Sequence, residues 1–413
     1  MNILFISSEY PPQTGHGGIG TYTFHVSLQL ALMGHNVHVI AAQNIGTEKS
    51  CVINGVTVHR ILPQNYPLPK SNFLFPFRKI CYKLLPHTLI RLSWINAVQK
   101  KVQSLFGNGY QFDIIEYPEC GAEGLRVNCP ESCAKIARLH TPWEIVRKYD
   151  LMPEPPGDKL LLPLLERLSV SRADGVSTPS YALGKLMESR WKLKNTSVIP
   201  NPIPVKMFPQ SSGTGWIYTG RIERRKGVHI LIKAYNKICE KFNPPPLKII
   251  GHEYGILPDN TSYGDYIRKL ISESKFSNKI EWIDHCEQEQ LKKFLSESSV
   301  AFFPSLWENF PYSCLEAMAS GVAVAVSDCG GFPEIVDHKK DGLIINTGDI
   351  DSWENAMELL ITNKDLEKAL QHSGYKKVLW KFDSVDICKK MESFYFEILR
   401  RKKHGITTRF QIN

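Results

Sequence analysis

Residues 2–41 read NILFISSEYPPQTGHGGIGTYTFHVSLQLALMGHNVHVIA. The apolar run at residues 2–8 has the length of a buried strand and is bounded by turn residues, and residues 37–41 form a second such run. Between them, residues 21–33 carry Phe24, Leu28 and Leu32 at helical spacing, and Gly34 is placed to end the helix. A strand, a helix and a second strand in this order predict a parallel sheet covered by helices.

The same alternation returns in the second half of the chain. We predict strands at 216–219, 247–250, 280–283, 300–303 and 322–326, and helices at 228–242, 266–276, 287–298 and 312–320. The 413-residue chain also exceeds what one hydrophobic core accommodates, roughly 250–300 residues. The sequence therefore predicts an α/β protein with two parallel sheets, one in each half.

Prolines and small residues interrupt the periodic pattern at 199–204 and 211–215. We therefore expect an N-terminal domain at 1–200, a linker at 201–215 and a C-terminal domain at 216–382. The tail from residue 384 is helical in pattern, so we expect a C-terminal helix at 383–413 that packs back on the N-terminal domain.

Composition is that of a soluble globular protein, with 43% hydrophobic and 22% charged residues. The start of the chain has no basic segment before its apolar run, and no later stretch approaches the ~20 apolar residues that span a bilayer. The ten cysteines are scattered, and no second pair accompanies Cys129 and Cys133 at zinc spacing. We expect a cytoplasmic protein with reduced thiols and no metal site.

The net charge of +9 is concentrated in one segment. Between Glu48 and Asp113 there is no acidic residue, whereas nine cations fall there: Lys49, Arg60, Lys70, Arg78, Lys79, Lys83, Arg91, Lys100 and Lys101. Residues 69–106 mix seven of these cations with large apolar side chains, namely Phe73, Phe75, Phe77, Tyr82, Leu84, Leu85, Trp94 and Phe106. Such a mixture suits peripheral contact with an anionic membrane surface. A pair of ordinary core helices with a basic outer face explains it equally well, and nucleic acid is disfavoured because no recognition module accompanies the charge.

The loop after the first strand contains Gly15-x-Gly17-x-x-Gly20, which matches a dinucleotide-binding fingerprint. A long loop with Pro11 and Pro12 separates these glycines from the strand, and the second strand ends in Ala41-Ala42-Gln43-Asn44 without an acid to hold a ribose. A nicotinamide enzyme is therefore disfavoured. Small residues ahead of a helix N-terminus still suit an anionic or sugar ligand, although a merely structural turn is the alternative.

A basic segment, Gly220-Arg221-Ile222-Glu223-Arg224-Arg225-Lys226-Gly227, follows the first strand of the second half. Ligands of open α/β sheets bind beyond the carboxyl ends of the strands. Arg221 can hold phosphate oxygens as a fork and Lys226 can neutralise them as a point charge. We expect Arg224 and Arg225 to lie mostly at the surface.

A third segment, residues 305–321, reads SLWENFPYSCLEAMASG. Pro311 suits the first turn of a helix and Gly321 suits its end. Glu308 then precedes the helix while Glu316 lies about one turn inside it, so the two carboxylates can be on the order of 10 Å apart. That spacing suits two parts of one extended ligand, with the helix N-terminus between them offering N–H groups to a diphosphate.

Together these motifs resemble the family four (group 1) retaining glycosyltransferases. The resemblance rests on Glu308-x7-Glu316, on Gly220-Arg221-x4-Lys226-Gly227, on the Pro-Pro and Gly-Gly loop at residues 11–18, on Ile199-Pro200-Asn201, and on Gly330-Gly331-x-x-Glu334. It implies the GT-B architecture, in which two doubly wound, Rossmann-like domains face each other across a cleft. The N-terminal domain would then serve the acceptor and the C-terminal domain the nucleotide-sugar donor.

The resemblance also implies roles for individual residues. Glu308 would bind hydroxyls of the donor sugar and Glu316 the ribose, while Arg221 and Lys226 would hold the diphosphate. Gly17 and Gly18 would lie near the phosphates and acceptor, and Asn309 and Phe310 under the sugar. His140 follows a strand as the family's active-site His does, and Glu334 is expected at the site unless it only caps a helix. Asn309 and Pro311 depart from the family's usual small residue and glycine.

The expected activity is therefore a hexosyl transfer with retention, to a glycan or lipid-linked acceptor, in cell-surface polysaccharide or glycolipid synthesis. Two cations at the diphosphate predict no need for a metal or other cofactor. The expected location is cytoplasmic, with peripheral contact at the inner face of the membrane. The alternatives are an epimerase-like enzyme acting on the nucleotide sugar alone and a non-catalytic donor-binding subunit.

Overall fold

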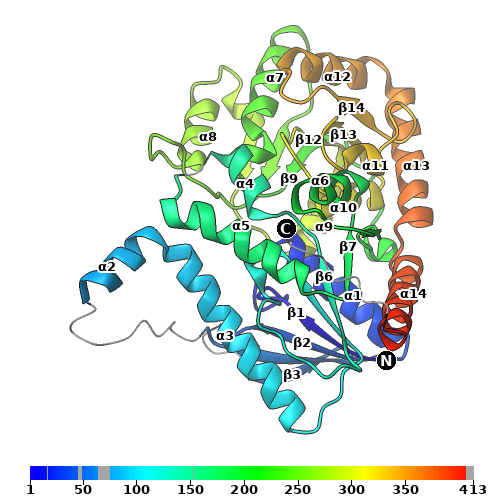
Figure 1. Ribbon diagram of the computed structural model, residues 1–413. Coiled ribbons are helices and arrows are strands. Elements are labelled where there is room, and N and C mark those ends of the chain that lie inside the picture. The colour runs from blue at the N-terminus through cyan, green and yellow to red at the C-terminus, as the bar shows by residue number, and fades with distance from the viewer. Residues whose placement is uncertain (16, 45–48, 64–74, 152, 406–413) are drawn as a thin grey trace. The chain divides into compact units, whose positions relative to one another are not determined.

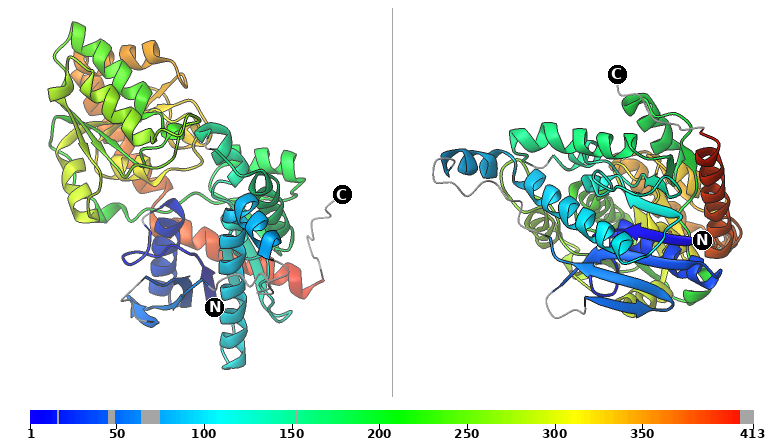
Figure 2. Two further views of the ribbon diagram at one scale, coloured as in Figure 1. Left: turned by 90° about the vertical axis from the view of Figure 1, so that its left-hand side faces the viewer. Right: turned by 60° about the horizontal axis from the view of Figure 1, so that its bottom comes forward.

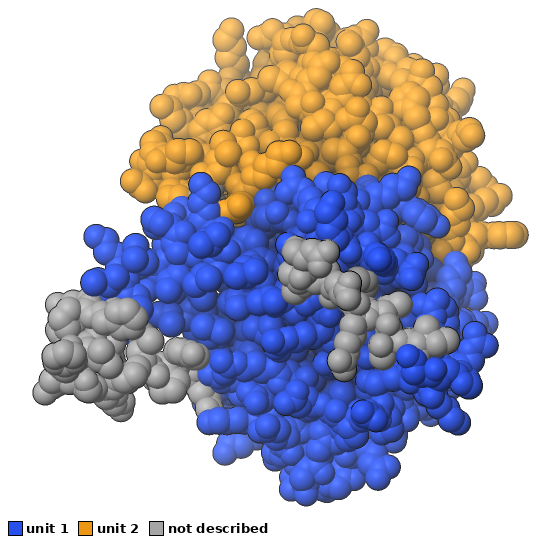
Figure 3. Space-filling view, viewed as in Figure 1, with its two compact units in different colours: residues 1–145, 154–202, 384–413 blue, residues 146–153, 203–383 orange. Residues whose placement is uncertain are grey.

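We analysed a computed structural model of the chain, which describes residues 1–15, 17–44, 49–63, 75–151 and 153–405. The chain divides into two compact units, coloured separately in Figure 3. Unit 1 comprises residues 1–145, 154–202 and 384–413, and unit 2 comprises residues 146–153 and 203–383. The two sheets predicted from the sequence are confirmed, one in each unit.

Unit 1 is built on an eight-stranded sheet in the order β3-β4-β2-β1-β5-β6-β7-β8. Its strands are β1 (Asn2–Ile6), β2 (Asn36–Ala42), β3 (Ser50–Ile53), β4 (Val56–Ile61), β5 (Ile114–Pro118), β6 (Ala134–Arg138), β7 (Gly175–Thr178) and β8 (Ser197–Val198). Every neighbouring pair is parallel except β3 and β4, which are antiparallel. The strand order reverses between β1 and β5, as in a doubly wound fold.

Helices cover both faces of this sheet (Figures 1 and 2). They are α1 (Gly18–Leu32), α2 (Phe75–Leu84), α3 (Pro86–Gly107), α5 (Pro156–Ser171), α6 (Tyr181–Trp191) and α14 (Ser384–Lys403), together with the start of α4 (Trp143–Asp150). Successive side chains of β5 point to opposite faces. Glu116 accepts hydrogen bonds from Tyr22 of α1 and Tyr395 of α14, both 2.7 Å, whereas the Tyr117 hydroxyl donates to a carbonyl of α5. Thus α1 and α14 lie on one face and α5 on the other.

Unit 2 is built on a six-stranded parallel sheet in the order β11-β10-β9-β12-β13-β14. Its strands are β9 (Gly215–Thr219), β10 (Leu247–Ile250), β11 (Ile280–Ile283), β12 (Ser298–Phe303), β13 (Ala323–Ser327) and β14 (Leu343–Ile345). Its helices are α7 (Val228–Lys241), α8 (Tyr263–Ser272), α9 (Gln288–Ser296), α10 (Tyr312–Ala319), α11 (Phe332–Ile335), α12 (Ile350–Thr362) and α13 (Lys364–Lys381). Numbered within the unit, the strand order is 3-2-1-4-5-6, that of a Rossmann fold, with its switch between β9 and β12.

The elements predicted in the second half are confirmed, with one shift. The helix predicted at 266–276 instead spans Tyr263–Ser272, so it begins three residues earlier and ends four residues earlier. It begins there because the Ser262 hydroxyl accepts a hydrogen bond from the N–H of Asp265 and caps the helix. A core of strand and helix side chains, including Trp216, Phe302 and Trp353, fills unit 2.

The predicted domain boundaries differ from the two units in two places. Residues 146–153 belong to unit 2, because the Asp150 carboxylate accepts the backbone N–H of Arg225 at 2.7 Å. Residues 203–215, predicted as linker, also belong to unit 2, where the N–H of Ser211 donates to the Ser320 carbonyl at 2.7 Å. Neither contact has a local sequence signal.

Most of the basic segment at 69–106 forms α2 and α3, and its residues 69–74 lie outside the described part of the chain. The side chains of residues 75–79 are likewise outside it. Trp94 is buried in the core, and the half-buried Phe106 packs edge-on against the buried Phe112 at the edge of the core. Arg91 lies beside Gly121, and its charge acts on the buried Glu123 carboxyl. Arg91 is therefore not part of a uniformly basic outer face.

Candidate active site

The switch point of the unit 2 sheet gathers the main predicted residues. Arg221 and Lys226 follow β9, and Glu308 follows β12. The two loops are joined by their backbones, since the N–H of Leu306 donates to the Arg225 carbonyl at 2.7 Å. Gly227 permits this approach: its φ is +71°, and a Cβ there would lie 1.9 Å from the Pro304 carbonyl oxygen.

Lys226 and Glu308 form an ion pair in this junction. The Ser305 hydroxyl also donates to Glu308 at 3.1 Å, and an Arg225 nitrogen lies 3.5 Å from the second carboxylate oxygen. Burial alone would raise the pKa of Glu308, but Lys226 and Arg225 outweigh burial and hold it below its usual range. Burial lowers the pKa of Lys226, which Glu308 partly restores. The pair is a charged, mostly desolvated group at the point where ligands of such sheets bind.

The expectation that Arg225 lies at the surface is wrong. Its side chain is 4% exposed and pairs with Glu223. It also donates to the Trp307 carbonyl at 3.0 Å and lies 3.8 Å from Asp150. Burial would lower the pKa of Arg225, but these carboxylates raise it, so it stays charged. Arg225 therefore ties the β9 loop, the β12 loop and residues 146–153 together.

Arg221, in contrast, remains accessible. Its side chain is 50% exposed and lies 3.3 Å from Glu223, with the guanidinium 5.3 Å from the centre of the Tyr254 ring. The Tyr218 hydroxyl donates to the Arg221 carbonyl at 2.9 Å and fixes its backbone. Arg224 is half-buried and donates to the Tyr149 carbonyl, so it too is more enclosed than expected. Of the basic segment, Arg221 thus has the most freedom to meet a ligand.

Glu316 lies in α10 and has different surroundings. It is buried, and burial raises the pKa of its carboxyl to about 7 despite a hydrogen bond with Gln288 and the charge of Lys292 on α9. Asn309 and Phe310, in the turn before α10, are buried too, and Phe310 packs edge-on against Phe382. Glu308 and Glu316 are therefore held in two distinct settings, one cationic and one nearly neutral.

The glycine pair after β13 supports the Glu308 loop. The N–H of Gly331 donates to the Glu308 carbonyl at 3.0 Å. Gly330 has φ +55°, and a Cβ at this position would lie only 1.7 Å from the same carbonyl oxygen, so only glycine fits there. Glu334 is half-buried in the first turn of α11, where a carboxylate suits the helix dipole. A glycine is thus needed at 330, because the backbone of residues 330 and 331 packs directly against the Glu308 loop.

In unit 1, the predicted glycine loop is filled by a residue that the sequence argument missed. Gly17 precedes α1 and Gly18 begins it. A Cβ on Gly17 would lie 2.4 Å from a carboxylate oxygen of Glu9, and the same oxygen accepts the N–H of Gly20 at 3.3 Å. A Cβ on Gly18 would meet nothing within 4 Å. Glu9 thus supplies a negative charge at the start of α1, where we expected an anionic or sugar ligand.

His140 lies two residues beyond β6, at the carboxyl edge of the unit 1 sheet. Its backbone N–H donates to Glu119 at 2.7 Å, and its ring meets the Tyr22 ring edge-on at 5.1 Å. Burial, followed by the charge of Arg138, lowers the pKa of His140 well below its ordinary value. The imidazole is therefore neutral near pH 7, with one donor nitrogen and one acceptor nitrogen.

Two buried carboxyls behind His140 were also missed. Burial and the nearby Glu166 raise the pKa of Glu119 to about 8, and burial raises the pKa of Glu166 to about 7. Glu166 accepts the backbone N–H groups of Gly121 and Trp143 at 3.0 and 2.9 Å. These contacts fix the loops after β5 and β6. The one sequence feature that could have identified Glu119 is its position directly after strand β5.

The chemistry available is that of a polar site without a preformed metal cage. Among the described residues, no group of three or more His, Cys, Asp or Glu side chains is placed to hold a metal ion. In the same parts of the chain, every helix is too short or too polar to cross a bilayer. The unit 2 switch point offers two cations, two carboxylates and the start of α10, a set that can bind a diphosphate and hydroxyl groups.

Two family models match this chain, one in each half. The model described as Glycosyltransferase Family 4 matches residues 16–206, and the model described as Glycosyl transferases group 1 matches residues 213–377. The second match contains Arg221, Lys226, Glu308 and Glu316.

Two curated relatives illustrate the range of similarity. An uncharacterized glycosyltransferase of Methanocaldococcus jannaschii is 24% identical over 416 residues, which cover 96% of this chain and 98% of that protein. The capsular polysaccharide biosynthesis glycosyltransferase CapM of Staphylococcus aureus is 28% identical over 187 residues, 45% of this chain and 47% of that protein.

Solved structures share the fold along the whole chain. A sucrose-phosphate synthase from Thermosynechococcus elongatus superposes with a TM-score of 0.75 at 20% identity, covering 97% of this chain and 99% of that one. HepE of Anabaena, in complex with UDP-glucose, gives a TM-score of 0.70 at 15% identity, covering 96% and 100%.

Proposed function

Because the chain belongs to the group 1 glycosyltransferases, whose two family models match residues 16–206 and 213–377, we propose that it is a retaining enzyme of the hexosyltransferase type. It moves a sugar from a nucleotide diphosphate sugar to a glycan or lipid-linked acceptor. Membership of this family favours transfer over an epimerase acting on the donor alone. HepE, a protein of the same fold, was solved with UDP-glucose, which supports a nucleotide-sugar donor here.

The observation that carries the proposal is the Lys226–Glu308 pair at the switch point, with the half-exposed Arg221 beside it. Breaking a glycosyl phosphate bond leaves negative charge on the diphosphate and positive charge at the sugar. Lys226 and Arg221 stabilise the leaving diphosphate, together with the N–H groups at the start of α10. Glu308 stays ionised because of Lys226 and Arg225, and it holds sugar hydroxyls as an acceptor.

The other predicted residues take supporting roles. Glu316, whose pKa is raised to about 7, binds the ribose hydroxyls, and Asn309 and Phe310 support the sugar. Neutral His140 contributes a hydrogen bond, and Glu334 completes the donor-binding set. Gly18 leaves open space beside the backbone for a ligand, whereas the Glu9 carboxylate occupies the space beside Gly17. Because cations on the protein neutralise the diphosphate, the reaction proceeds without a divalent metal.

A panel of UDP-, GDP- and ADP-sugars tests the donor. One of them should raise the melting temperature and be slowly hydrolysed, and NMR of a transferred product should show the anomeric configuration of the donor. Binding without any turnover would instead indicate a non-catalytic donor-binding subunit. Inversion at the anomeric carbon would overturn the retaining assignment.

The Lys226→Ala variant tests the site. We expect kcat to fall at least about a hundredfold, because a preorganised stabiliser of the leaving group is lost. Lys275→Ala, which removes an exposed lysine of the same unit, is the matched control and should keep full turnover. Near-normal turnover of a folded Lys226→Ala protein would remove Lys226 from the site.

We further propose that unit 1 contacts a membrane that carries the acceptor. Large apolar side chains are exposed on α2, α3 and α5, helices that contact one another: Ile80, Tyr82 and Leu84 on α2, Ile90 on α3, and Leu160 and Leu164 on α5. Exposed Lys83 and Lys159 accompany them. A patch of this kind suits the anionic inner face of a membrane, where a lipid-linked acceptor is found. CapM, which is similar to 45% of this chain, is named for capsular polysaccharide biosynthesis, which supports a role in cell-surface glycans.

Liposome flotation tests the membrane contact. The protein should float with vesicles that contain phosphatidylglycerol and not with neutral vesicles. Leu160→Ser combined with Leu164→Ser should reduce flotation, whereas Leu32→Ser, at a more exposed leucine of α1, should not. Equal recovery of all variants, or no flotation at all, would overturn the membrane proposal and leave the donor chemistry unaffected.

A further inference from the structure

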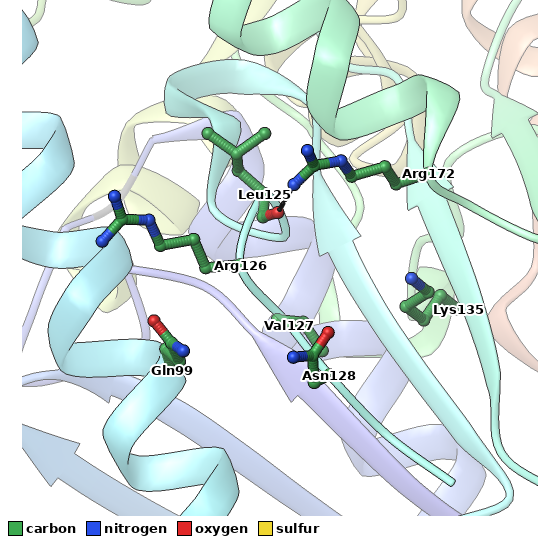
Figure 4. Close-up of a pocket in the computed structure, with 7 residues that line it drawn as sticks. All are labelled: Gln99, Leu125, Arg126, Val127, Asn128, Lys135 and Arg172. Carbon is green, nitrogen blue, oxygen red and sulfur yellow. Dashed lines mark hydrogen bonds between the residues drawn. The ribbon is translucent and has the colours of Figure 1, made fainter. Parts of the chain in front are cut away.

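Unit 1 contains a cavity whose lining includes none of the predicted site residues (Figure 4). Its volume is about 400 Å³, within the range of roughly 300–1,000 Å³ typical of small-molecule sites. Its walls come from α3, from the loop after β5, from β6 and from the end of α5. The polar residues among them are Gln99, Arg126, Asn128, Lys135 and Arg172.

The charge of this cavity is one-sided. Arg126, Lys135 and Arg172 contribute three cations, and no acidic residue lines it among the residues that the structure describes. In Figure 4, Arg172 and Lys135 lie on one side of residues 125–128, whereas the Arg126 side chain extends to the other side, where Gln99 of α3 lies. Like charges gathered in one concavity repel each other, and an anion bound among them would relieve that repulsion.

Two of the cations are already positioned by contacts that keep their charge. Arg172 donates to the Leu125 carbonyl at 2.7 Å, and Arg126 donates to the Asn96 side chain. Both partners are neutral. Asp174 accepts the backbone N–H of Lys135 at 2.8 Å, and its carboxylate is paired with Lys402 at the same distance. The carboxylate next to Lys135 is thus engaged by a lysine from outside the cavity lining.

The cavity is also separate from the carboxyl edge of the sheet. Lys135 is the second residue of β6, whereas His140 follows the other end of that strand. Arg172 ends α5, just before β7 begins at Gly175. The cations therefore lie at the amino edge, opposite to where ligands of doubly wound sheets bind.

We propose that this cavity is a second anion site, which binds a small phosphate ester such as a sugar phosphate. Guanidinium groups bind phosphate oxygens through paired N–H donors, and Lys135 adds a point charge. The amides of Gln99 and Asn128 offer hydrogen bonds to hydroxyl groups of the ester. The volume leaves room for more than an inorganic phosphate.

Calorimetric titration with glucose 6-phosphate, inorganic phosphate and glucose tests the site. The titrations use the Lys226→Ala protein, so that the donor site contributes little to the signal. We expect glucose 6-phosphate to bind, phosphate to bind more weakly and glucose not to bind. The combined Arg126→Gln and Lys135→Gln changes should weaken binding at least about tenfold, because two charge-assisted contacts are lost. Lys194→Gln, at an exposed lysine of the same unit, should change nothing.

A second measurement needs no variant in the cavity. Acylation of lysines, mapped by mass spectrometry in the wild-type protein, should slow at Lys135 and not at Lys194 when glucose 6-phosphate is present. Unchanged acylation of Lys135, or equal affinity after the two substitutions, would overturn the proposal. Weaker binding of glucose 6-phosphate than of phosphate would also contradict it, since the site would then hold the anion alone.

Discussion

Arg225 is surrounded by three carboxylates in a nearly dry environment, so its removal leaves uncompensated charge. Arg225→Ala should lower the free energy of unfolding by about 3–5 kcal/mol, the usual loss when one partner of a buried ion pair is deleted. Arg224→Ala, the neighbouring control, removes one hydrogen bond to a carbonyl and should cost about 1 kcal/mol. Urea denaturation measures both. Equal losses for the two variants would contradict the central position of Arg225.

Glu316 should make stability depend on pH. Its pKa is about 7 in the folded protein against an ordinary value of 4.5, so the folded state holds the proton more tightly. Stability should therefore fall as pH rises from about 4.5 to 7, by about 3 kcal/mol for this group alone. Glu316→Gln removes that contribution.

The measurement is the difference in unfolding free energy between wild type and Glu316→Gln at pH 5 and pH 7.5. Other buried carboxyls titrate equally in both proteins and cancel in this difference. The variant should gain relative stability as pH rises. A constant difference across this range would show that Glu316 titrates normally.

At the scale of elements, the start of α7 depends on a glycine. Gly227 and Gly348 both have positive φ, at +71° and +80°, but only Gly227 would place a Cβ against backbone. Gly348→Ala should cost about 1 kcal/mol from backbone strain alone. Gly227→Ala should cost clearly more and should also reduce turnover, because the adjacent Lys226 is displaced. Similar losses in both variants would show that the contact with Pro304 yields easily.

The elements of unit 2 were predictable because each strand and helix has its own periodic signal. Strands at 247–250 and 280–283 were predicted at the residues where they occur. Helix α8 was misplaced because a single hydroxyl, Ser262, sets its start. In unit 1 the periodic pattern identified only the opening strand, helix and second strand, and the other strands, including the antiparallel β3, were not predicted from it.

The candidate site was predictable where a motif is local and not where partners are distant. The sequence selects Lys226 and Glu308, and the structure joins them in one ion pair. It does not reveal that Arg225 is buried, since Asp150 is 75 residues away along the chain. Glu9 was missed for a related reason: its carboxylate folds back onto glycines that had been read as open space.

For the whole molecule, we expect catalysis to be independent of divalent metal. Transfer in excess EDTA should stay within about twofold of the rate with Mg²⁺, because Arg221 and Lys226 neutralise the diphosphate. The comparison requires the donor identified by the panel above. A rate that collapses in EDTA and recovers with Mg²⁺ would contradict this assignment.

The assignment of residues 146–153 to unit 2 limits how such proteins recombine. A gene exchange at residue 200 would give a chimera whose Arg225 meets a foreign residue in place of Asp150. Its unit 1 would also combine residues 1–200 of one parent with α14 of the other. Tyr395 would then no longer be matched to Glu116. Viable hybrids between relatives should therefore take residues 146–153 from the parent that supplies unit 2, and α14 from the parent that supplies unit 1. The crossover points would then follow the packing of the two units rather than the midpoint of the chain.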